Sequence, residues 1–249
     1  MKIIISPAKK MNIETDLMDI LDMPVFMEQT EVLFQYLKGL SYEEAKKLWE
    51  CSEKLAKENY SWLGKMELKK QLTPALLSYE GIQYQYMAPN VFDEAQWEYV
   101  QKHLRILSGF YGVLRPLDGI VPYRLEMQAK IDFSDYKSLY QFWGDSLYKE
   151  ISRETDWILN LASKEYSKCI EKYLDGNIPY ITCVFGVRKN GRIIQKATLA
   201  KMARGEMVRY LAENRVIAPE EIKKFTGLGF IYQEASSTET VYVFVKEDM

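Results

Sequence analysis

Short apolar segments alternate with amphipathic segments along the whole chain, and this alternation limits the possible folds more than any other feature. Residues 2–5 and 157–161 have the length and composition of buried strands. Apolar side chains recur at helical spacing in longer segments, at residues 28–38, 94–103 and 198–214. No internal repeat or linker-like tract interrupts the pattern. The sequence therefore predicts an α/β mixed (α+β) fold, with one compact domain over residues 1–249, a central mixed sheet and surrounding helices.

Local signals add detail to this pattern. The capping-box spacing of Ser41 and Glu44 predicts a helix that begins there and runs to about Lys57. Residues 137–151 carry apolar side chains at the spacing of a single amphipathic helix. The dipeptide Asn190-Gly191 lies between two apolar runs, and this arrangement is the strongest short-range signal of a tight β-hairpin.

Residues that carry metal or redox chemistry are scarce. The chain has one His, so a multi-His metal centre is excluded. The three cysteines, at positions 51, 169 and 183, are far apart, and we expect buried thiols rather than a redox pair. The sequence has neither a signal segment nor an apolar run long enough to cross a membrane. We therefore expect a cytoplasmic protein with no membrane partner, no metal and no cofactor.

Charge is distributed unevenly along the chain. The formal net charge is −2, yet residues 176–215 contain eight basic and two acidic residues, which leaves +6 there and −8 elsewhere. In the predicted helix, Lys201 and Arg204 lie on one broad face, which is either a phosphate-binding surface or an ordinary solvated one. Gly205 follows in mid-helix, a position that often permits close approach of another backbone or a ligand.

Residues 105–127 form the densest polar group in the sequence. Three arginines and two carboxylates of this segment lie among glycines, prolines and aromatic residues, at Arg105, Arg115, Asp118, Arg124 and Glu126. In one interpretation these side chains form buried ion pairs that fix the loop conformation. In the other they line a cleft, in which the arginines hold a phosphate and the carboxylates exchange protons.

One long segment and several short ones carry a family resemblance. The long segment is LSGFYGVLRPLD, from Leu107 to Asp118. The short segments are SPAK at 6–9, PYRLEM at 122–127, LYQFWGD at 139–145, NLAS at 160–163, ARGEM at 203–207 and ENR at 213–215. In this order, across nearly the whole chain, they resemble the YaaA family of bacterial peroxide stress proteins.

The resemblance implies a single-domain fold peculiar to that family, with a positively charged cleft and a helix-hairpin-helix element. It implies binding of double-stranded or structured DNA, a role in the response to hydroperoxide, and a part in iron homeostasis that limits iron-dependent damage. It establishes no catalytic activity. We expect phosphate contacts from Lys9, Arg115, Arg124, Lys201, Arg204, Arg209 and Arg215. Because phosphate contacts carry little sequence information, we expect weak sequence preference.

Two segments are candidates for the helix-hairpin-helix. Residues 37–48 match its pattern of hydrophobic residues and glycine, except that Ser41 replaces the second glycine and acidic residues flank the turn. The second candidate is the helix at 198–214, a turn at 216–219 and the short helix that follows. It lacks the glycines but carries the positive charge, and we favour it for that reason.

An enzyme that acts on a nucleotide or on damaged DNA is the alternative function. Its site would lie in residues 105–127, with Asp118 or Glu126 as the acid or base and Lys9 as the nucleophile. This alternative requires that a single concave pocket contains Lys9, Arg115, Asp118, Arg124 and Asn160. Nothing in the sequence specifies an oligomeric state.

Overall fold

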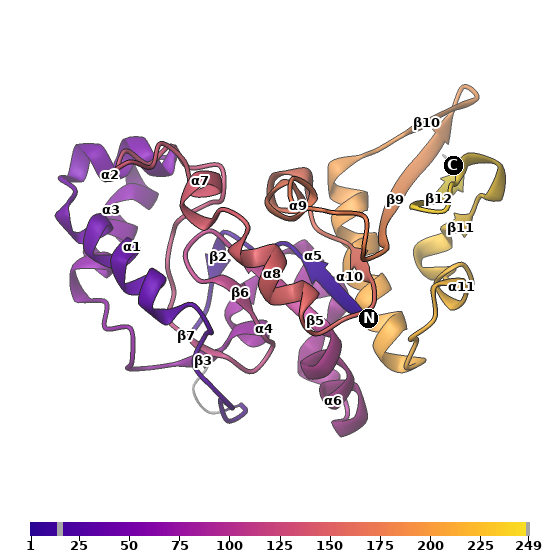
Figure 1. The fold of residues 1–249 in the computed structure, drawn as a ribbon, viewed down its shortest axis with the longest axis horizontal. Coiled ribbons are helices and arrows are strands. Elements are labelled where there is room, and N and C mark those ends of the chain that lie inside the picture. Colours follow the sequence, from indigo (N-terminus) through magenta and orange to yellow (C-terminus); the bar gives the residue numbers. More distant parts are fainter. Residues whose placement is uncertain (14–16, 248–249) are drawn as a thin grey trace.

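A central eight-stranded mixed sheet organises the computed structural model, which describes residues 1–13 and 17–247 (Figure 1). The strand order is β11-β12-β9-β8-β1-β5-β6, and β10 pairs with β9. Five neighbouring strands are parallel: β12 (Val241–Glu247), β9 (Tyr180–Lys189), β8 (Ile158–Asn160), β1 (Lys2–Ile5) and β5 (Leu104–Ser108). Three strands are antiparallel to their neighbours: β6 (Gly112–Leu114), β10 (Arg192–Ile194) and β11 (Ile231–Tyr232). The predicted fold class and mixed sheet are confirmed.

The order of the parallel strands reverses direction at β1. The chain leaves β1 toward β5 on one side, and it later leaves β8 toward β9 on the other side. The carboxyl ends of β1 and β8 are adjacent, because Ile4 pairs in register with Asn160. Connections that diverge in this way leave a crevice outside the strand ends, where open α/β sheets commonly bind ligands.

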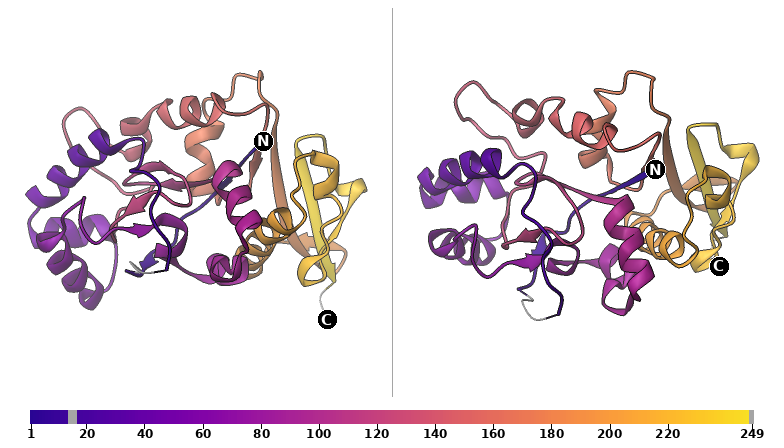
Figure 2. Two further views of the ribbon diagram at one scale, coloured as in Figure 1. Left: turned by 90° about the horizontal axis from the view of Figure 1, so that it is seen from below. Right: turned by 60° about the horizontal axis from the view of Figure 1, so that its bottom comes forward.

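Helices cover both faces of the sheet, with α8 (Ser146–Ser152) and α9 (Lys164–Glu171) on one face and α6 (Glu94–His103) and α10 (Ala197–Glu213) on the other (Figure 2). At one end of the long axis lie α1 (Met27–Gly39), α2 (Tyr42–Trp49) and α3 (Glu53–Lys65). The shorter helices are α4 (Ala75–Ser78), α5 (Ile82–Met87), α7 (Leu139–Trp143) and α11 (Pro219–Ile222). Two small sheets pair β2 (Lys10–Met11) with β4 (Tyr79–Glu80) and β3 (Thr73–Pro74) with β7 (Gly119–Ile120).

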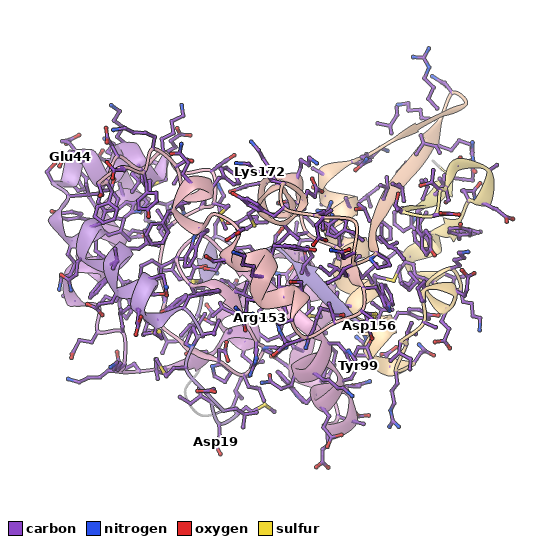
Figure 3. All side chains as sticks on the ribbon, viewed as in Figure 1. Asp19, Glu44, Tyr99, Arg153, Asp156 and Lys172 are labelled. Carbon is purple, nitrogen blue, oxygen red and sulfur yellow. The ribbon has the colours of Figure 1, made fainter. Side chains whose placement is uncertain are left out.

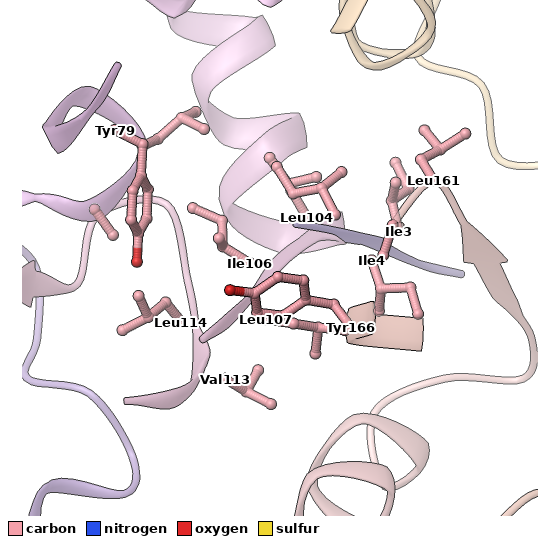
Figure 4. Packing of buried hydrophobic residues seen from close by; sticks show 14 of the residues in the cluster. Ile3, Ile4, Tyr79, Leu104, Ile106, Leu107, Val113, Leu114, Leu161 and Tyr166 are labelled. Carbon is pink, nitrogen blue, oxygen red and sulfur yellow. The ribbon is translucent and has the colours of Figure 1, made fainter. Parts of the chain in front are cut away.

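The hydrophobic core follows the middle of the sheet. Ile3, Ile4 and Ile5 of β1 are fully buried, because helices cover both faces of that strand. This explains why β1 is an uninterrupted apolar run and does not alternate. Figure 4 shows part of the packing, with Ile3, Leu104 and Leu161 among the buried side chains. Among the described residues, no helix is both long and apolar enough to cross a membrane.

The local signals predict helix starts better than helix ends. The Ser41–Glu44 capping box is present, but α2 ends at Trp49, because Glu50 has a φ of +43°, and the separate helix α3 begins at Glu53. The single helix predicted over 137–151 is two helices, because Gly144 has a φ of +52° and ends α7. The hairpin at Asn190-Gly191 is confirmed, and both residues have the positive φ that a type I′ turn requires.

Candidate functional site

A pocket of about 420 Å³ lies outside the carboxyl ends of β1 and β8, where the strand order reverses. Its wall comes from five separate parts of the chain, at residues 6–10, 80–84, 123–126, 163–166 and 201–204. The first segment directly follows β1, the fourth begins three residues after the end of β8, and the last lies in the first turns of α10. This position at the topological switch point makes the pocket our candidate functional site.

Hydrogen bonds tie the two strand ends together at the base of the pocket. The Ser163 backbone N–H donates to Ser6 Oγ at 2.8 Å, and Ser6 Oγ donates to Ser163 Oγ at 3.1 Å. The Tyr84 hydroxyl on α5 donates to the Ser6 carbonyl at 3.0 Å. These contacts explain the serine at both strand ends. The Ser6 hydroxyl accepts from a backbone N–H that lies beyond the end of the strand pairing and has no ladder partner.

Two glycines allow the pocket wall to close. A Cβ at Gly205 would lie 2.0 Å from the Gln83 carbonyl oxygen, so only glycine lets α10 approach α5 this closely. A Cβ at Gly109 would lie 2.5 Å from the Leu125 carbonyl oxygen. Gly205 therefore places Arg204 at the pocket, and Gly109 places the segment with Arg124 and Glu126. The close approach that the sequence indicated for Gly205 is confirmed.

Basic side chains outnumber acidic ones in the wall. Glu126 accepts from two cations, with Lys9 Nζ at 2.8 Å and Arg124 Nη2 at 3.1 Å, and Lys10 pairs with Glu80 at 2.6 Å. Lys201 and Arg204 have no ion pair within the described part of the chain. Lys201 and Arg204 are thus the uncompensated cations of the wall. They lie beside Lys9 and Arg124, which share the Glu126 carboxylate.

Three buried nitrogen atoms of the pocket-lining side chains have no hydrogen-bond partner in residues 1–13 and 17–247. They are Gln83 Nε2, Arg124 Nε and Arg204 Nε. Burial lowers the pKa of the Arg204 guanidinium from its ordinary value, with the nearby Cys183 acting in the opposite direction. A buried donor without an acceptor costs free energy, typically about 1–3 kcal/mol, so an acceptor-rich ligand at this position would be bound favourably.

Tyrosines and one further carboxylate complete the wall. The phenol of Tyr123 is neutral at physiological pH, because burial raises its pKa to about 12. Burial also raises the pKa of the Glu165 carboxyl, although the Gln128 backbone N–H donates to it. The tyrosine rings give the pocket an apolar part beside its basic part. The arrangement can therefore hold a ligand that is partly anionic and partly flat and apolar.

Comparison with known proteins identifies the family. The profile described as peroxide stress protein YaaA matches residues 1–236. A UPF0246 protein of Lachnoclostridium phytofermentans is 57% identical over 246 residues, which is 99% of this chain and 96% of the relative. A UPF0246 protein of Agathobacter rectalis is 52% identical over 247 residues, 99% of each chain. The chain belongs to the YaaA family of peroxide stress proteins. The family match includes every segment that lines the pocket.

The pocket of this YaaA family member contains only some of the residues singled out in the sequence. Five of them line it together: Lys9, Arg124, Glu126, Lys201 and Arg204. Asn160 instead lies buried in β8, where its Oδ1 accepts from the Ala162 N–H. Arg209 pairs with Glu213 at 2.8 Å, and Arg215 is exposed at the end of α10. Neither of these two arginines lines the pocket.

Arg115 and Asp118 belong to a different cavity, which corrects the acid–base group proposed for residues 105–127. That cavity also contains Arg105. The Arg115 side chain pairs with Glu154 at 2.9 Å, while its backbone N–H donates to Asp118 Oδ2 at 2.8 Å. The sequence suggested one cleft because the residues are close in the chain. The structure separates them because the chain turns at residues 116–117 and then pairs as β7 with β3 before Arg124 is reached.

Gln83, Tyr84, Glu165 and Tyr166 are pocket residues that the sequence analysis did not single out. Their local patterns are those of ordinary helix residues. Glu165 follows Ser163 in the first turn of α9, and Gln83 lies in α5, a helix of six residues. Only the contact between α5 and α10 brings Gln83 to the basic side chains, and no short-range signal encodes that contact.

The two helix-hairpin-helix candidates differ in how their turns are capped. At the first, the Ser41 hydroxyl accepts from the Glu44 N–H and the Glu44 carboxylate accepts from the Ser41 N–H, so side chains occupy the amides that a phosphate would use. Glu44 lies at the end of the molecule away from the β9–β10 hairpin (Figure 3). At the second, α10 is joined to the four-residue α11, and the Tyr210 hydroxyl donates to the Glu221 carbonyl. The element stays a prediction at both places.

Two of the three thiols are buried as the sequence predicts, and the third is not. Cys169 and Cys183 are buried, and Cys51 is partly exposed. Burial raises the pKa of the Cys169 thiol to about 12 and raises that of Cys183 as well. A thiol of this kind is a poor nucleophile at neutral pH, because the reactive form is the thiolate. The described residues contain no group of three or more His, Cys, Asp or Glu that could hold a metal ion.

Proposed function

We propose that this protein binds DNA in the peroxide stress response, with the pocket and its rim as the cleft that holds the phosphate backbone. The DNA is duplex or structured, sequence preference is weak, and binding helps to limit iron-dependent peroxide damage. Family membership supports the stress context. The observation that carries the DNA-binding part is the pair of uncompensated cations, Lys201 and Arg204, beside Lys9 and Arg124 at one pocket.

The charges at the pocket suit a phosphate backbone. The planar guanidinium groups of Arg124 and Arg204 offer several donors to phosphate oxygens, and Lys201 adds an exposed point charge. Concave walls focus the field of such charges, so a chain of net charge −2 can still attract DNA. Arg209 and Arg215 continue along α10 and serve as outer contacts. Arg115 is left out of the proposal, because it lies at the other cavity and pairs there with Glu154.

The test is the salt dependence of binding to a duplex of random sequence, measured by fluorescence anisotropy. Each phosphate contact contributes about −0.9 to the slope of log K against log salt. We expect the Lys201→Met, Arg204→Met double variant to lower affinity about tenfold or more near ~50 mM salt and to reduce the slope by about 2. The control is Arg153→Met, since Arg153 is exposed at the end of α8 (Figure 3).

Two results would overturn the proposal. One is wild-type binding that is absent at low salt or unchanged at high salt. The other is equal weakening by the double variant and by Arg153→Met, because a general loss of positive charge would then explain the effect. Circular dichroism and thermal melting of each variant show whether the fold is retained.

A further inference from the structure

We propose that the pocket binds a single nucleotide, with the phosphate at Lys201 and Arg204 and the base beside Gln83. This inference deepens the proposed function, because it names the ligand of the same site. The nucleotide is either an unpaired residue of bound DNA or a free nucleoside monophosphate. Both have the same chemistry at the pocket, namely an anionic phosphate, a sugar and a flat base with hydrogen-bonding edges.

The size of the pocket fits this ligand. Its volume of about 420 Å³ is many times that of a phosphate ion, and it falls within the range of small-molecule sites. A bare phosphate would therefore leave most of the wall without contact. The backbone of duplex DNA can contact the rim of such a pocket, but a base pair cannot enter it. An unpaired nucleotide can enter, as it does in proteins that extrude a base from the stack.

The unpartnered donors fit the two halves of a nucleotide. Arg204 Nε and Arg124 Nε, the latter in a side chain that is 10% exposed, have no acceptor among the described residues. Gln83 is 7% exposed, and within the described part of the chain its Nε2 also has no acceptor. Guanidinium nitrogen atoms match phosphate oxygens, whereas a Gln amide matches the donor and acceptor edge of a base. One pocket thus offers both kinds of recognition.

The remaining wall supplies an apolar surface for the base. Tyr84, Tyr123 and Tyr166 are nearly buried and line the pocket, together with Ile82 and Leu125. Aromatic side chains bind unpaired bases without strong sequence preference, because every base has an apolar face. The hydroxyls of Tyr84 and Tyr123 already have partners, so these rings are held in place. A carboxylate metabolite without a ring would use the basic part of the pocket and leave this apolar part unfilled.

The first arm of the experiment measures free ligands by isothermal titration calorimetry on the full chain. The probes are the four deoxynucleoside monophosphates and inorganic phosphate. We expect saturable binding of at least one monophosphate, about tenfold or more tighter than inorganic phosphate, which is about 1.4 kcal/mol. Gln83→Met should weaken this binding about fivefold, while Gln85→Met, an exposed position on the same helix, should not change it.

The second arm uses a duplex that carries 2-aminopurine opposite an abasic position. Wild-type protein should change the 2-aminopurine fluorescence about twofold or more on binding, since the probe leaves the stack. Gln83→Met should reduce the change and Gln85→Met should retain it. If Gln83→Met fails to fold, Gln83→Glu takes its place and should reduce the fluorescence change in the same way. It keeps the side-chain shape and replaces the amide donor by a carboxylate acceptor.

The outcomes separate this inference from the proposed function. Salt-dependent duplex binding without monophosphate binding and without a fluorescence change overturns the inference and leaves the proposed function intact. Equal affinity for phosphate and monophosphates also overturns it, because only an anion site would remain. Monophosphate binding without any DNA binding supports the inference with a free nucleotide as ligand and overturns the proposed function. A fluorescence change that depends on Gln83 supports an extruded nucleotide.

Discussion

At the scale of single residues, Glu154 holds together three cations that would otherwise repel one another. Its carboxylate lies 2.9 Å from Lys2 Nζ, 2.6 Å from Arg105 Nη2 and 2.9 Å from Arg115 Nη2. Burial alone would raise the pKa of Glu154, but the hydrogen bonds from Lys2 and Arg105 lower it to about 2. The side chains of Lys2 and Arg105 are nearly buried, so their charges depend on this carboxylate.

We predict that Glu154→Ala lowers the free energy of unfolding by about 3 kcal/mol, because two buried cations lose their counter-ion. Urea denaturation monitored by circular dichroism measures the change. The control is Glu213→Ala, which removes a half-exposed pair with Arg209 four residues away and should cost about 0.5 kcal/mol or less. Equal costs for the two variants would contradict the idea that Glu154 is structurally important.

Asp118 gives a prediction for pH. Burial raises the pKa of its carboxyl from 3.8 to about 7, although the Arg115 backbone N–H and the charges of Arg115 and Arg105 favour the ionised form. The folded protein therefore binds this proton more tightly than the unfolded chain does. Stability from this group is present below about pH 4, decreases as the pH rises toward 7, and is lost above it.

We expect the Asp118→Asn variant to remove this pH dependence while its Oδ1 still accepts from the Arg115 N–H. Between about pH 5 and pH 8, the free energy of unfolding of the wild type should decrease relative to the variant, at a rate below ~1.4 kcal/mol per pH unit. Urea midpoints across this range provide the measurement. Asp145→Asn, at a half-exposed position, should follow the wild-type profile. Parallel wild-type and Asp118→Asn profiles would show that Asp118 does not titrate in this range.

At the scale of elements, the contact between α5 and α10 shapes the pocket, and glycine makes it possible. A methyl group at Gly205 would collide with the Gln83 carbonyl, which is rigid backbone. We predict that Gly205→Ala lowers stability by about 1–3 kcal/mol despite the better helix propensity of alanine. Gly64→Ala in α3 is the matched control: a Cβ there meets nothing within 4 Å, and we expect about 0.5–1 kcal/mol of stabilisation.

The β9–β10 hairpin is a second element with a prediction of its own. It projects from the body of the molecule, and Lys189 and Arg192 are exposed near its tip (Figure 1). A two-stranded ribbon of this kind fits the major groove of duplex DNA. If the hairpin contacts DNA as well, the Lys189→Ala, Arg192→Ala double variant should reduce the slope of log K for DNA binding against log salt by about 2. The pair Lys54→Ala and Lys65→Ala on α3 is the control, and an unchanged slope in the hairpin variant would exclude the hairpin from the interface.

Elements with strong local signals were predictable, and their ends were not. The capping box at Ser41 and the Asn190-Gly191 turn depend on neighbouring residues, so the sequence contains the whole signal. The break at Glu50 is different, because a non-glycine residue in a left-handed conformation is fixed by the packing of α2 and α3. The buried face of α10 includes Ala200, Ala203 and Gly205, whose small size lets α5 approach, and hydrophobic periodicity does not indicate such a contact.

At the scale of the whole molecule, the candidate site is a product of topology. The sequence indicated several of its charged residues and the family, but it grouped Arg115 with Arg124 because they are near in the chain. The strand order decides otherwise: it brings the segment after β1 beside the segment after β8 and leaves Asp118 in a separate cavity with Arg105 and Arg115. Neither the spacing of apolar residues nor the residues of a turn indicate which distant strands pair. The set of residues that lines the pocket could therefore not be predicted from local sequence patterns.

This topology leads to a final prediction, about where bound DNA protects the protein from hydrogen exchange. A ligand in the pocket contacts five segments at once, so its binding free energy opposes the local opening of each of them. Exchange should slow at residues 6–10, 80–84, 123–126, 163–166 and 201–204. Helices α2 and α3 lie at the far end of the long axis and should exchange as in the free protein (Figure 2).

The comparison is made by mass spectrometry with and without duplex DNA at low salt, and again at a salt concentration that releases the DNA. Protection that disappears with release reports the complex rather than a change in solvent. The Lys201→Met, Arg204→Met double variant should lose the protection at all five segments together, because the cations attract the ligand that joins them. Protection that is strongest in α2 and α3 would instead place the DNA at the Ser41 turn, and the first helix-hairpin-helix candidate would then be the better one.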